Sequence, residues 1–282
     1  MMLVVFLSFK PQEIFMNNKP IAVVDSGVGG LACLDRIRKA LPHEDIIYFG
    51  DTANMPYGTK TEEQLVCCVR NFTEYLREYG VKMIVLACGT MSSTMIPFFY
   101  KNYPEILVQG IIEPAVSAVS RACSDGDKVG VIATPRSIES GAYKAAFDRL
   151  RKKLDVSYKG CPDLSVYIEK GITDGPEMEA LLHSYLDEMV YEHGIGTLLL
   201  GCTHYPLVAG CIGRMYPDLK IIDPAENLAR NASMLLKVHD FEMGDDRDGN
   251  LIIYVSKKTE GFDNMAGILG LGSVPIEEVE LK

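Results

Sequence analysis

The sequence predicts an α/β protein of two similar lobes, each a mostly parallel sheet flanked by helices, with an active site in the cleft between the lobes. Short apolar runs alternate with helical patterns almost throughout the 282 residues, which is typical of parallel βαβ units. A chain of this length exceeds the usual size of one domain. A weak internal duplication is also visible. A strand followed by a polar loop near Gly27 precedes Cys88, and a similar strand ending at Thr134 precedes Cys202.

The strands are expected at apolar runs bounded by turn signals, since such runs are typical of buried parallel strands. Helices are expected in the gaps. One begins at the capping-box pattern 61–64 and stops near Gly80, and another begins near Pro176 and runs to Gly194. The acidic stretch 244–249 is expected to be a turn, and a last helix closes the chain after the final strand. The expected strands are 21–24, 46–49, 83–87, 107–112, 129–133, 156–159, 198–201, 219–222 and 251–255.

The first residues are expected to lie outside the fold. The apolar run 2–7 lacks the basic segment and the small-residue cleavage site of a signal peptide. Residues 16–20 look like a natural start. Residues 1–18 are therefore interpreted as an N-terminal extension, either a misassigned upstream start or a disordered tail.

Composition and charge argue against several classes of function. The net charge of −10 and the isoelectric point near 5.1 oppose nucleic-acid binding, which needs a clustered basic surface. No stretch reaches the roughly 18 apolar residues of a membrane span. Eight cysteines in a chain of this length are far fewer than a disulfide scaffold uses, so we expect reduced thiols in a cytoplasmic protein.

Two cysteines at the ends of matching strands are the most informative feature. Cys88 lies in Val-Leu-Ala-Cys-Gly-Thr at 85–90, and Cys202 lies in Leu-Leu-Gly-Cys-Thr-His-Tyr-Pro at 199–206. Ligands of open α/β sheets bind beyond the carboxyl ends of the strands, where backbone N–H groups at helix starts favour an anion. We therefore expect a site that combines one thiol from each half of the chain and takes a small anionic substrate.

Polar residues in neighbouring loops are further candidates. Asp25 ends the first strand and could deprotonate a thiol, or it could cap the next helix. His204 could orient the second thiol or shuttle its proton. The turn 56–58 offers backbone donors to a carboxylate, and Thr134 and Ser137 stand at a helix start, although surface turns and simple capping also explain such patterns. The histidines are scattered and neither cysteine has partners at the spacing of a metal cluster, so no metal site is expected.

These segments together resemble glutamate racemases, the cofactor-independent enzymes of the aspartate/glutamate racemase superfamily that supply D-glutamate for peptidoglycan. The resemblance covers roughly residues 19–281, and the motif 201–206 is its most specific part. It rests on both cysteine motifs, on Glu169, and on the segments 25–30, 48–52, 56–58, 113–115, 140–143 and 161–162.

The resemblance implies a first lobe built from residues 19–114 and 226–282 and a second lobe built from residues 115–225. The substrate, L- or D-glutamate, would lie between the lobes. No cofactor is implied, and a homodimer is the expected assembly.

By the same resemblance, Cys88 and Cys202 are the catalytic thiols, one removing the Cα proton and the other returning a proton to the opposite face. Asp25 assists near Cys88, and Glu169 and His204 assist near Cys202. Racemisation without a cofactor needs an acid/base group on each face of a planar carbon, which places the two sulfurs about 7 Å apart. The implied substrate contacts are Asp25, Ser26, Pro56, Tyr57, Gly58, Gly89, Thr90, Thr134 and Thr203.

Two residues depart from the pattern of that family. Gly89 stands where an asparagine usually contacts the charged end of the substrate, and losing such a bond costs about 1.5–3 kcal/mol unless water replaces it. Arg136 stands where a small residue is common. Three hypotheses therefore stay open: an active glutamate racemase, a racemase of another amino acid such as aspartate, and a catalytically impaired homologue with a binding or regulatory role.

Overall fold

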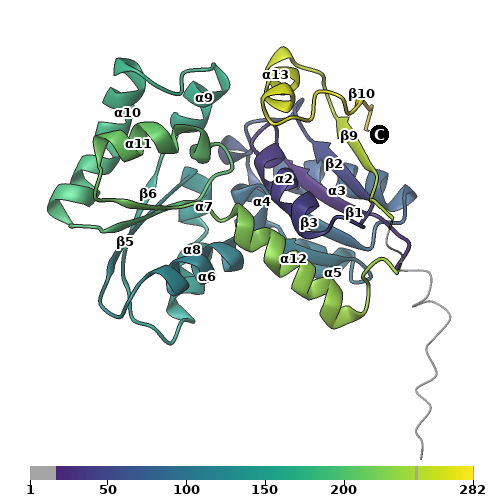
Figure 1. Cartoon of the computed structure of the whole chain (residues 1–282), viewed down its shortest axis with the longest axis horizontal. Coiled ribbons are helices and arrows are strands. Elements are labelled where there is room, and N and C mark those ends of the chain that lie inside the picture. Colours follow the sequence, from purple (N-terminus) through teal and green to yellow (C-terminus); the bar gives the residue numbers. More distant parts are fainter. Residues whose placement is uncertain (1–16, 245–246, 282) are drawn as a thin grey trace, which may run out of the picture.

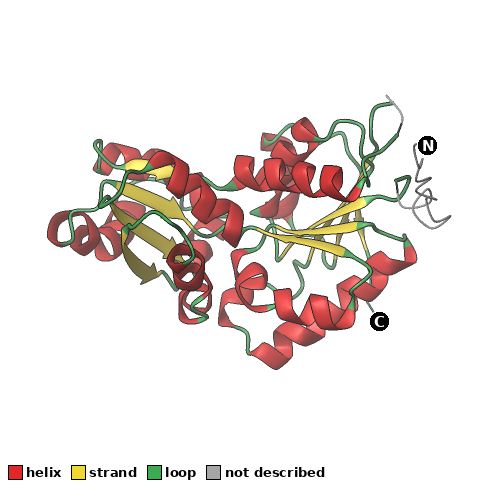
Figure 2. Cartoon of the chain, turned by 90° about the horizontal axis from the view of Figure 1, so that it is seen from below, coloured by secondary structure: helices red, strands yellow, loops and turns green. Residues whose placement is uncertain are grey.

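The protein contains two parallel sheets, each with helices on both faces (Figures 1 and 2). The computed structural model describes residues 17–244 and 247–281, so nearly all of the predicted extension 1–18 lies outside the described residues. The predicted fold class is confirmed. We call each sheet with its helices a lobe. Within the described ranges, no helix is both long and apolar enough to cross a membrane.

The first sheet contains β1 (Ile21–Asp25), β2 (Ile46–Gly50), β3 (Met83–Leu86), β4 (Leu107–Gly110), β9 (Leu251–Val255) and β10 (Ile276–Glu278). The second contains β5 (Lys128–Ala133), β6 (Asp155–Gly160), β7 (Thr197–Leu200) and β8 (Lys220–Ile222). Their spatial orders are β10-β9-β2-β1-β3-β4 and β6-β5-β7-β8, with parallel pairing in both. The order β2-β1-β3-β4 is repeated by β6-β5-β7-β8, which agrees with the internal duplication seen in the sequence.

Three apolar cores hold the sheets and helices together. The largest is shared by both lobes, and the other two lie on the remaining face of each sheet. The shared core includes α2 (Gly30–Ala40), α6 (Ile112–Ala122), α8 (Ala142–Asp148), α12 (Ala225–His239) and α13 (Glu260–Ile268). On the outer face of the first sheet lie α3 (Glu62–Glu78), α4 (Gly89–Thr94) and α5 (Ile96–Asn102), and on that of the second lie α9 (Leu164–Glu169), α10 (Pro176–Asp187) and α11 (Ala209–Met215).

Helix α12 joins the two lobes, because it packs against α2 on the first lobe and against α6, which contacts the second sheet (Figure 1). This packing places the apolar face of α12 in the shared core. Burial of a common apolar surface stabilises the lobes as one unit.

The predicted start of α3 is confirmed. The hydroxyl of Thr61 accepts a hydrogen bond from the Gln64 backbone N–H at 3.3 Å, and the Gln64 side chain accepts one from the Thr61 N–H at 2.9 Å. This reciprocal pair satisfies two N–H groups that have no partner inside the helix. Gly80 follows the end of the helix with a φ of 68°, a left-handed conformation that glycine adopts without strain.

Two predicted boundaries are wrong, and a third is confirmed with a change of helix type. The strand predicted over 107–112 ends at Gly110, because α6 begins at Ile112 and accommodates Pro114 in its first turn. The helix predicted to run to Gly194 does run almost to that residue, because α10 (Pro176–Asp187) continues directly into a π-helical turn over Glu188–Glu192. The chain does not close on a helix, because β10 follows α13 and pairs with β9. The predicted limits of the lobes stay a prediction.

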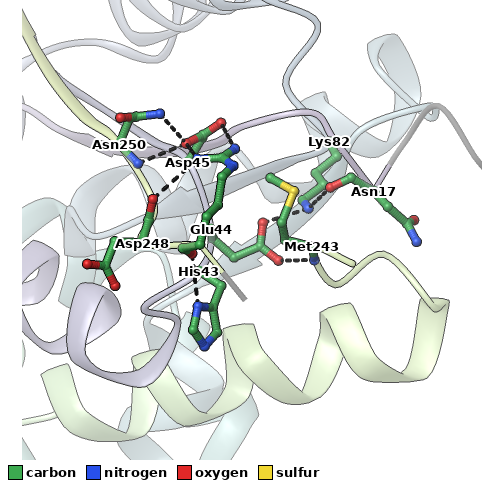
Figure 3. A network of polar contacts seen from close by, with 9 residues as sticks. Asn17, His43, Glu44, Asp45, Lys82, Met243, Asp248 and Asn250 are labelled. Carbon is green, nitrogen blue, oxygen red and sulfur yellow. Dashed lines mark hydrogen bonds and ion pairs between the residues drawn. The ribbon is translucent and has the colours of Figure 1, made fainter. Parts of the chain in front are cut away.

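A buried ion pair connects distant segments at the amino ends of the first sheet (Figure 3). Nζ of Lys82 lies 2.6 Å from Oε2 of Glu44, and both side chains are almost completely buried. Lys82 also donates hydrogen bonds to the carbonyls of Asn17 and Phe241, at 2.8 and 2.7 Å, and Oε1 of Glu44 accepts one from the Met243 N–H at 2.7 Å. The network therefore joins four separate segments on the side away from the carboxyl ends.

Candidate active site

A small cavity lies between the lobes, where the carboxyl ends of their central strands face each other. Its free volume is about 20 Å³, which is room for about one water molecule. Every predicted catalytic or substrate-contact residue except Asp25 lines it, whereas the further candidate Ser137 does not. The lining residues are Ser26, Pro56, Tyr57, Gly58, Cys88, Gly89 and Thr90 of the first lobe, and Thr134, Ser165, Glu169, Gly201, Cys202, Thr203 and His204 of the second.

The parallel strands explain why these side chains meet. Asp25 is the last residue of β1, and Cys88 follows the neighbouring β3 by two residues. In the second lobe, Thr134 directly follows β5, and Cys202 follows the neighbouring β7 by two residues. Carboxyl ends of parallel strands share one edge of a sheet, so each lobe contributes one such edge to the cavity.

Cys88 is a buried thiol at the start of α4. Its Sγ donates a hydrogen bond to Oγ of Ser26 at 3.8 Å. Burial and the nearby charge of Asp25 raise the pKa of Cys88 to about 12, although hydrogen bonds with the Met91 backbone and Ser26 oppose the shift. Cys88 therefore carries its proton at neutral pH and is available as a proton donor.

Asp25 lies behind the cavity wall and connects the lobes. It is completely buried, accepts a hydrogen bond from the Gly27 N–H at 2.9 Å, and accepts another from the Thr203 hydroxyl of the second lobe at 3.2 Å. Burial raises the pKa of Asp25, against the lowering effect of the His204 charge and of these hydrogen bonds. Gly29, not Asp25, is the N-cap residue of α2.

Cys202 stands beside a histidine that a carboxylate supports from behind. Sγ of Cys202 lies 3.7 Å from Nδ1 of His204, and Nε2 of His204 lies 3.0 Å from Oε1 of Glu169. Burial alone lowers the pKa of His204, but the close contacts with Cys202 and Glu169 and the charges of Cys202 and Asp25 raise it well above its ordinary value. The imidazole beside the Cys202 sulfur therefore holds a proton more strongly than an ordinary histidine does.

A chain of hydroxyl groups crosses the cleft at another wall of the cavity. Oγ1 of Thr90 lies 3.1 Å from Oγ1 of Thr134, which in turn lies 2.8 Å from Oγ of Ser137. Thr134 also caps the short helix α7 (Pro135–Glu139) by accepting from the Ser137 N–H at 3.3 Å. The capping alternative for Thr134 is thus confirmed, and the same residue lines the cavity.

Ser165 and Gly201 also line the cavity, and neither was predicted from the sequence. Ser165 precedes Glu169 by one turn of α9, and this helical spacing was the only signal for it. Cys161, just before that helix, is completely buried, and its carbonyl accepts a hydrogen bond from the Tyr205 hydroxyl at 3.2 Å. Cys161 therefore packs in the second lobe and does not line the cavity.

One group of potential metal ligands lies elsewhere among the described residues. Asp174, Glu179 and Cys211 approach one another on the second lobe, where Arg214 already pairs with Asp174. This group is separate from the cavity, and it provides no support for a metal at either cavity cysteine.

The fold and the site together define a two-lobed α/β protein that presents one thiol from each lobe to a small central cavity. A family model described as Asp/Glu/Hydantoin racemase matches residues 21–232, and the chain belongs to this family.

Individual glutamate racemases are similar to this chain over most of their length. Glutamate racemase 1 of Caldanaerobacter subterraneus subsp. tengcongensis is 37% identical over 252 residues, which cover 89% of this chain and 92% of that protein. The glutamate racemase of Carboxydothermus hydrogenoformans is 33% identical over 263 residues, covering 93% and 96%. The crystal structure of the Francisella tularensis glutamate racemase in complex with D-glutamate superposes with a TM-score of 0.85 at 31% identity, covering 94% of this chain and 99% of that one. The resemblance seen in the sequence is confirmed.

Proposed function

We propose that this protein interconverts L- and D-glutamate by a two-thiol mechanism that uses no cofactor. The observation that supports the proposal is the cavity itself, which has Cys88 on the first lobe and Cys202 on the second. A racemase that works by proton transfer needs an acid/base group on each face of the substrate Cα. The similarity to named glutamate racemases supports glutamate as the substrate and favours it over aspartate.

In the proposed reaction, one thiolate removes the Cα proton and leaves a planar carbanion, and the opposite thiol donates its proton to the other face. After this step the first sulfur is protonated and the second is ionised, which is the starting state for the reverse reaction. Because Cys88 holds its proton at neutral pH, we propose that the resting protein is prepared for the enantiomer whose Cα proton faces Cys202. His204 and Glu169 assist Cys202, and Asp25 acts near Cys88.

The proposed substrate contacts are Ser26, the turn 56–58, Gly89, the hydroxyls of Thr90 and Thr134, and Thr203. A cavity with room for about one water is too small for glutamate. We therefore propose that the lobes separate to admit the substrate and close around it.

A cytoplasmic role in supplying D-glutamate for peptidoglycan is part of the same proposal and is supported by the names of the relatives alone. The homodimer stays a prediction. The catalytically impaired alternative, suggested by Gly89, predicts no turnover of any amino acid.

The test is circular-dichroism measurement of racemisation, with no added cofactor, of both enantiomers of glutamate and of aspartate. We expect the wild type to racemise glutamate and Cys88→Ser and Cys202→Ser each to lose about 10²–10⁴-fold in rate, the usual contribution of a general acid or base. Cys67→Ser, at an exposed thiol on α3, is the matched control and should match the wild type. A wild type that racemises aspartate and not glutamate, or full activity in either site variant, would contradict the proposal.

A further inference from the structure

We propose that Gly89, with Gly29 as a second contact, sets the spacing of the two thiols by letting the backbone of the first lobe rest directly on the segment that carries Cys202. This inference rests on the proposed function for its chemical meaning. The contact itself is independent of which amino acid the protein uses.

The contact at Gly89 leaves no room for any side chain. A Cβ added to Gly89 would lie 2.5 Å from the carbonyl oxygen of Gly201, well inside the distance that real Cβ atoms keep. That oxygen is backbone and is fixed in place, since it accepts a hydrogen bond from the Tyr143 hydroxyl at 3.2 Å and the Gly201 N–H donates to the Ile132 carbonyl at 2.7 Å. A side chain at position 89 must therefore displace one lobe relative to the other.

A second glycine of the first lobe contacts the residue that follows Cys202 in the chain. A Cβ added to Gly29 would lie 2.4 Å from Oγ1 of Thr203. Gly89 touches the residue before Cys202, and Gly29 touches the residue after it. The first lobe thus contacts the segment 201–203 at the two residues that flank Cys202 in the chain, and Cys88 directly precedes Gly89, one of the two contacting glycines.

The geometry changes the interpretation of Gly89. The sequence predicted that its missing side chain costs a hydrogen bond to the substrate. In this structure the Gly201 carbonyl occupies the space that the side chain would need. Gly89→Asn is therefore expected to lower the rate of racemisation. Proton transfer requires both sulfurs near Cα, and a misplacement of about 1 Å costs roughly 10²-fold in rate.

The test is the alkylation rate of each cysteine in the full-length protein without glutamate, measured by peptide mass spectrometry after timed exposure to iodoacetamide. We expect Gly89→Ala to raise the rates at Cys88 and Cys202 several-fold, because the lobes are held apart. Exposed Cys67 is the internal standard, and buried Cys33 and Cys161 should stay unreactive. Gly196→Ala is the matched control, because an added Cβ there meets no atom within 4 Å.

Wild-type alkylation rates at Cys88 and Cys202 in Gly89→Ala, with Cys33 and Cys161 protected, would overturn the inference. If Cys33 and Cys161 react as well, Gly89→Ala has lost its fold, and Gly29→Ala is tested instead. Faster alkylation of Cys202 in Gly29→Ala supports the inference, and an unchanged rate overturns it. In folded Gly89→Ala we also expect kcat for glutamate to fall about 10²-fold while KM changes much less. Alkylation does not require turnover, so failure of the proposed function and failure of this inference are distinguishable.

Discussion

Nε2 of His204 lies 3.0 Å from Oε1 of Glu169, so the imidazole that faces Cys202 is supported from behind by a carboxylate. The histidine is buried, and Glu169 is partly exposed at the end of α9. A nucleophile or base, a neighbouring imidazole and a third orienting group form a recurrent arrangement at sites of proton transfer. In this protein it occurs on one wall of the cavity, whereas Cys88 on the opposite wall has Ser26 and Asp25 as neighbours.

Glu169→Gln is expected to shift the pH dependence of turnover. Glu169 is one of the groups that raise the pKa of His204, so its loss lowers that pKa. Folding therefore favours the protonated form of His204. The stability that this proton adds is complete below the pKa of about 6.5 that His204 has in the unfolded chain, and it is lost as pH rises through the raised pKa of the folded protein. For the enantiomer whose Cα proton we propose Cys202 to remove, the alkaline limb of kcat/KM should move to lower pH. Glutamate racemisation followed in both directions across pH measures this shift.

The control for this pH profile is Glu177→Gln, which changes an exposed carboxylate on α10. Its profile should match that of the wild type. An unchanged alkaline limb in Glu169→Gln, in both directions of the reaction, would show that Glu169 does not set the ionisation of His204.

Asp25→Asn is expected to make Cys88 more reactive. The charge of Asp25 raises the pKa of Cys88, while burial, the larger cause, persists in the variant. The pKa should therefore fall below about 12 without reaching its ordinary value, and alkylation of Cys88 at a fixed mildly alkaline pH should be faster than in the wild type. Exposed Asp218→Asn serves as the control. An unchanged alkylation rate would mean that Asp25 is uncharged in the folded protein.

Thr90→Val is expected to weaken substrate binding more than turnover. The Thr90 hydroxyl lies in the cavity wall and contacts Thr134 across the cleft at 3.1 Å. Losing a neutral hydrogen bond costs about 0.5–1.5 kcal/mol, which corresponds to roughly a two- to tenfold rise in KM. Steady-state kinetics with L- and D-glutamate provide the measurement, with Thr173→Val outside the cavity as the control. A KM equal to that of the wild type would exclude Thr90 from the substrate contacts.

The sequence predicted the strands and most of the cavity lining because both depend on local patterns. A buried parallel strand is an apolar run, and its carboxyl end fixes where the next polar residue lies, so Cys88 and Cys202 were recognisable as site residues. β10 was missed because a three-residue strand carries too little periodicity to be distinguished from a loop.

Contacts between segments that are distant in the chain could not be predicted from the sequence. Gly89 was interpreted as the loss of a side chain that contacts the substrate. Nothing in the local sequence reveals that the Gly201 carbonyl fills the space of that side chain. From the sequence, Lys82 is simply a lysine before a strand. Its partner Glu44 lies in a distant turn, so the ion pair could not be predicted. Both relationships arise only when the lobes and the sheet are assembled.

Lys82→Met is expected to destabilise the fold without changing the site. The substitution leaves the Glu44 carboxylate buried without its cation, and breaking a buried pair in this way costs about 3–5 kcal/mol. The carbonyls of Asn17 and Phe241 also lose their donor. Urea denaturation measures the free energy of unfolding, and racemisation per folded molecule should stay at the wild-type level because the pair lies at the amino ends of the strands.

The double variant Lys82→Met with Glu44→Leu separates the loss of the charge pair from the loss of packing. Removing both charges relieves the uncompensated carboxylate, so the double variant should be more stable than Lys82→Met alone. Recovery should be incomplete, because the Met243 N–H and the two carbonyls lose their partners and each unsatisfied buried group costs about 1–3 kcal/mol. Lys237→Met, at an exposed lysine on α12, is the matched control. If Lys82→Met lowers the free energy of unfolding by less than about 1 kcal/mol, then water reaches Glu44 and the pair does not behave as a buried one.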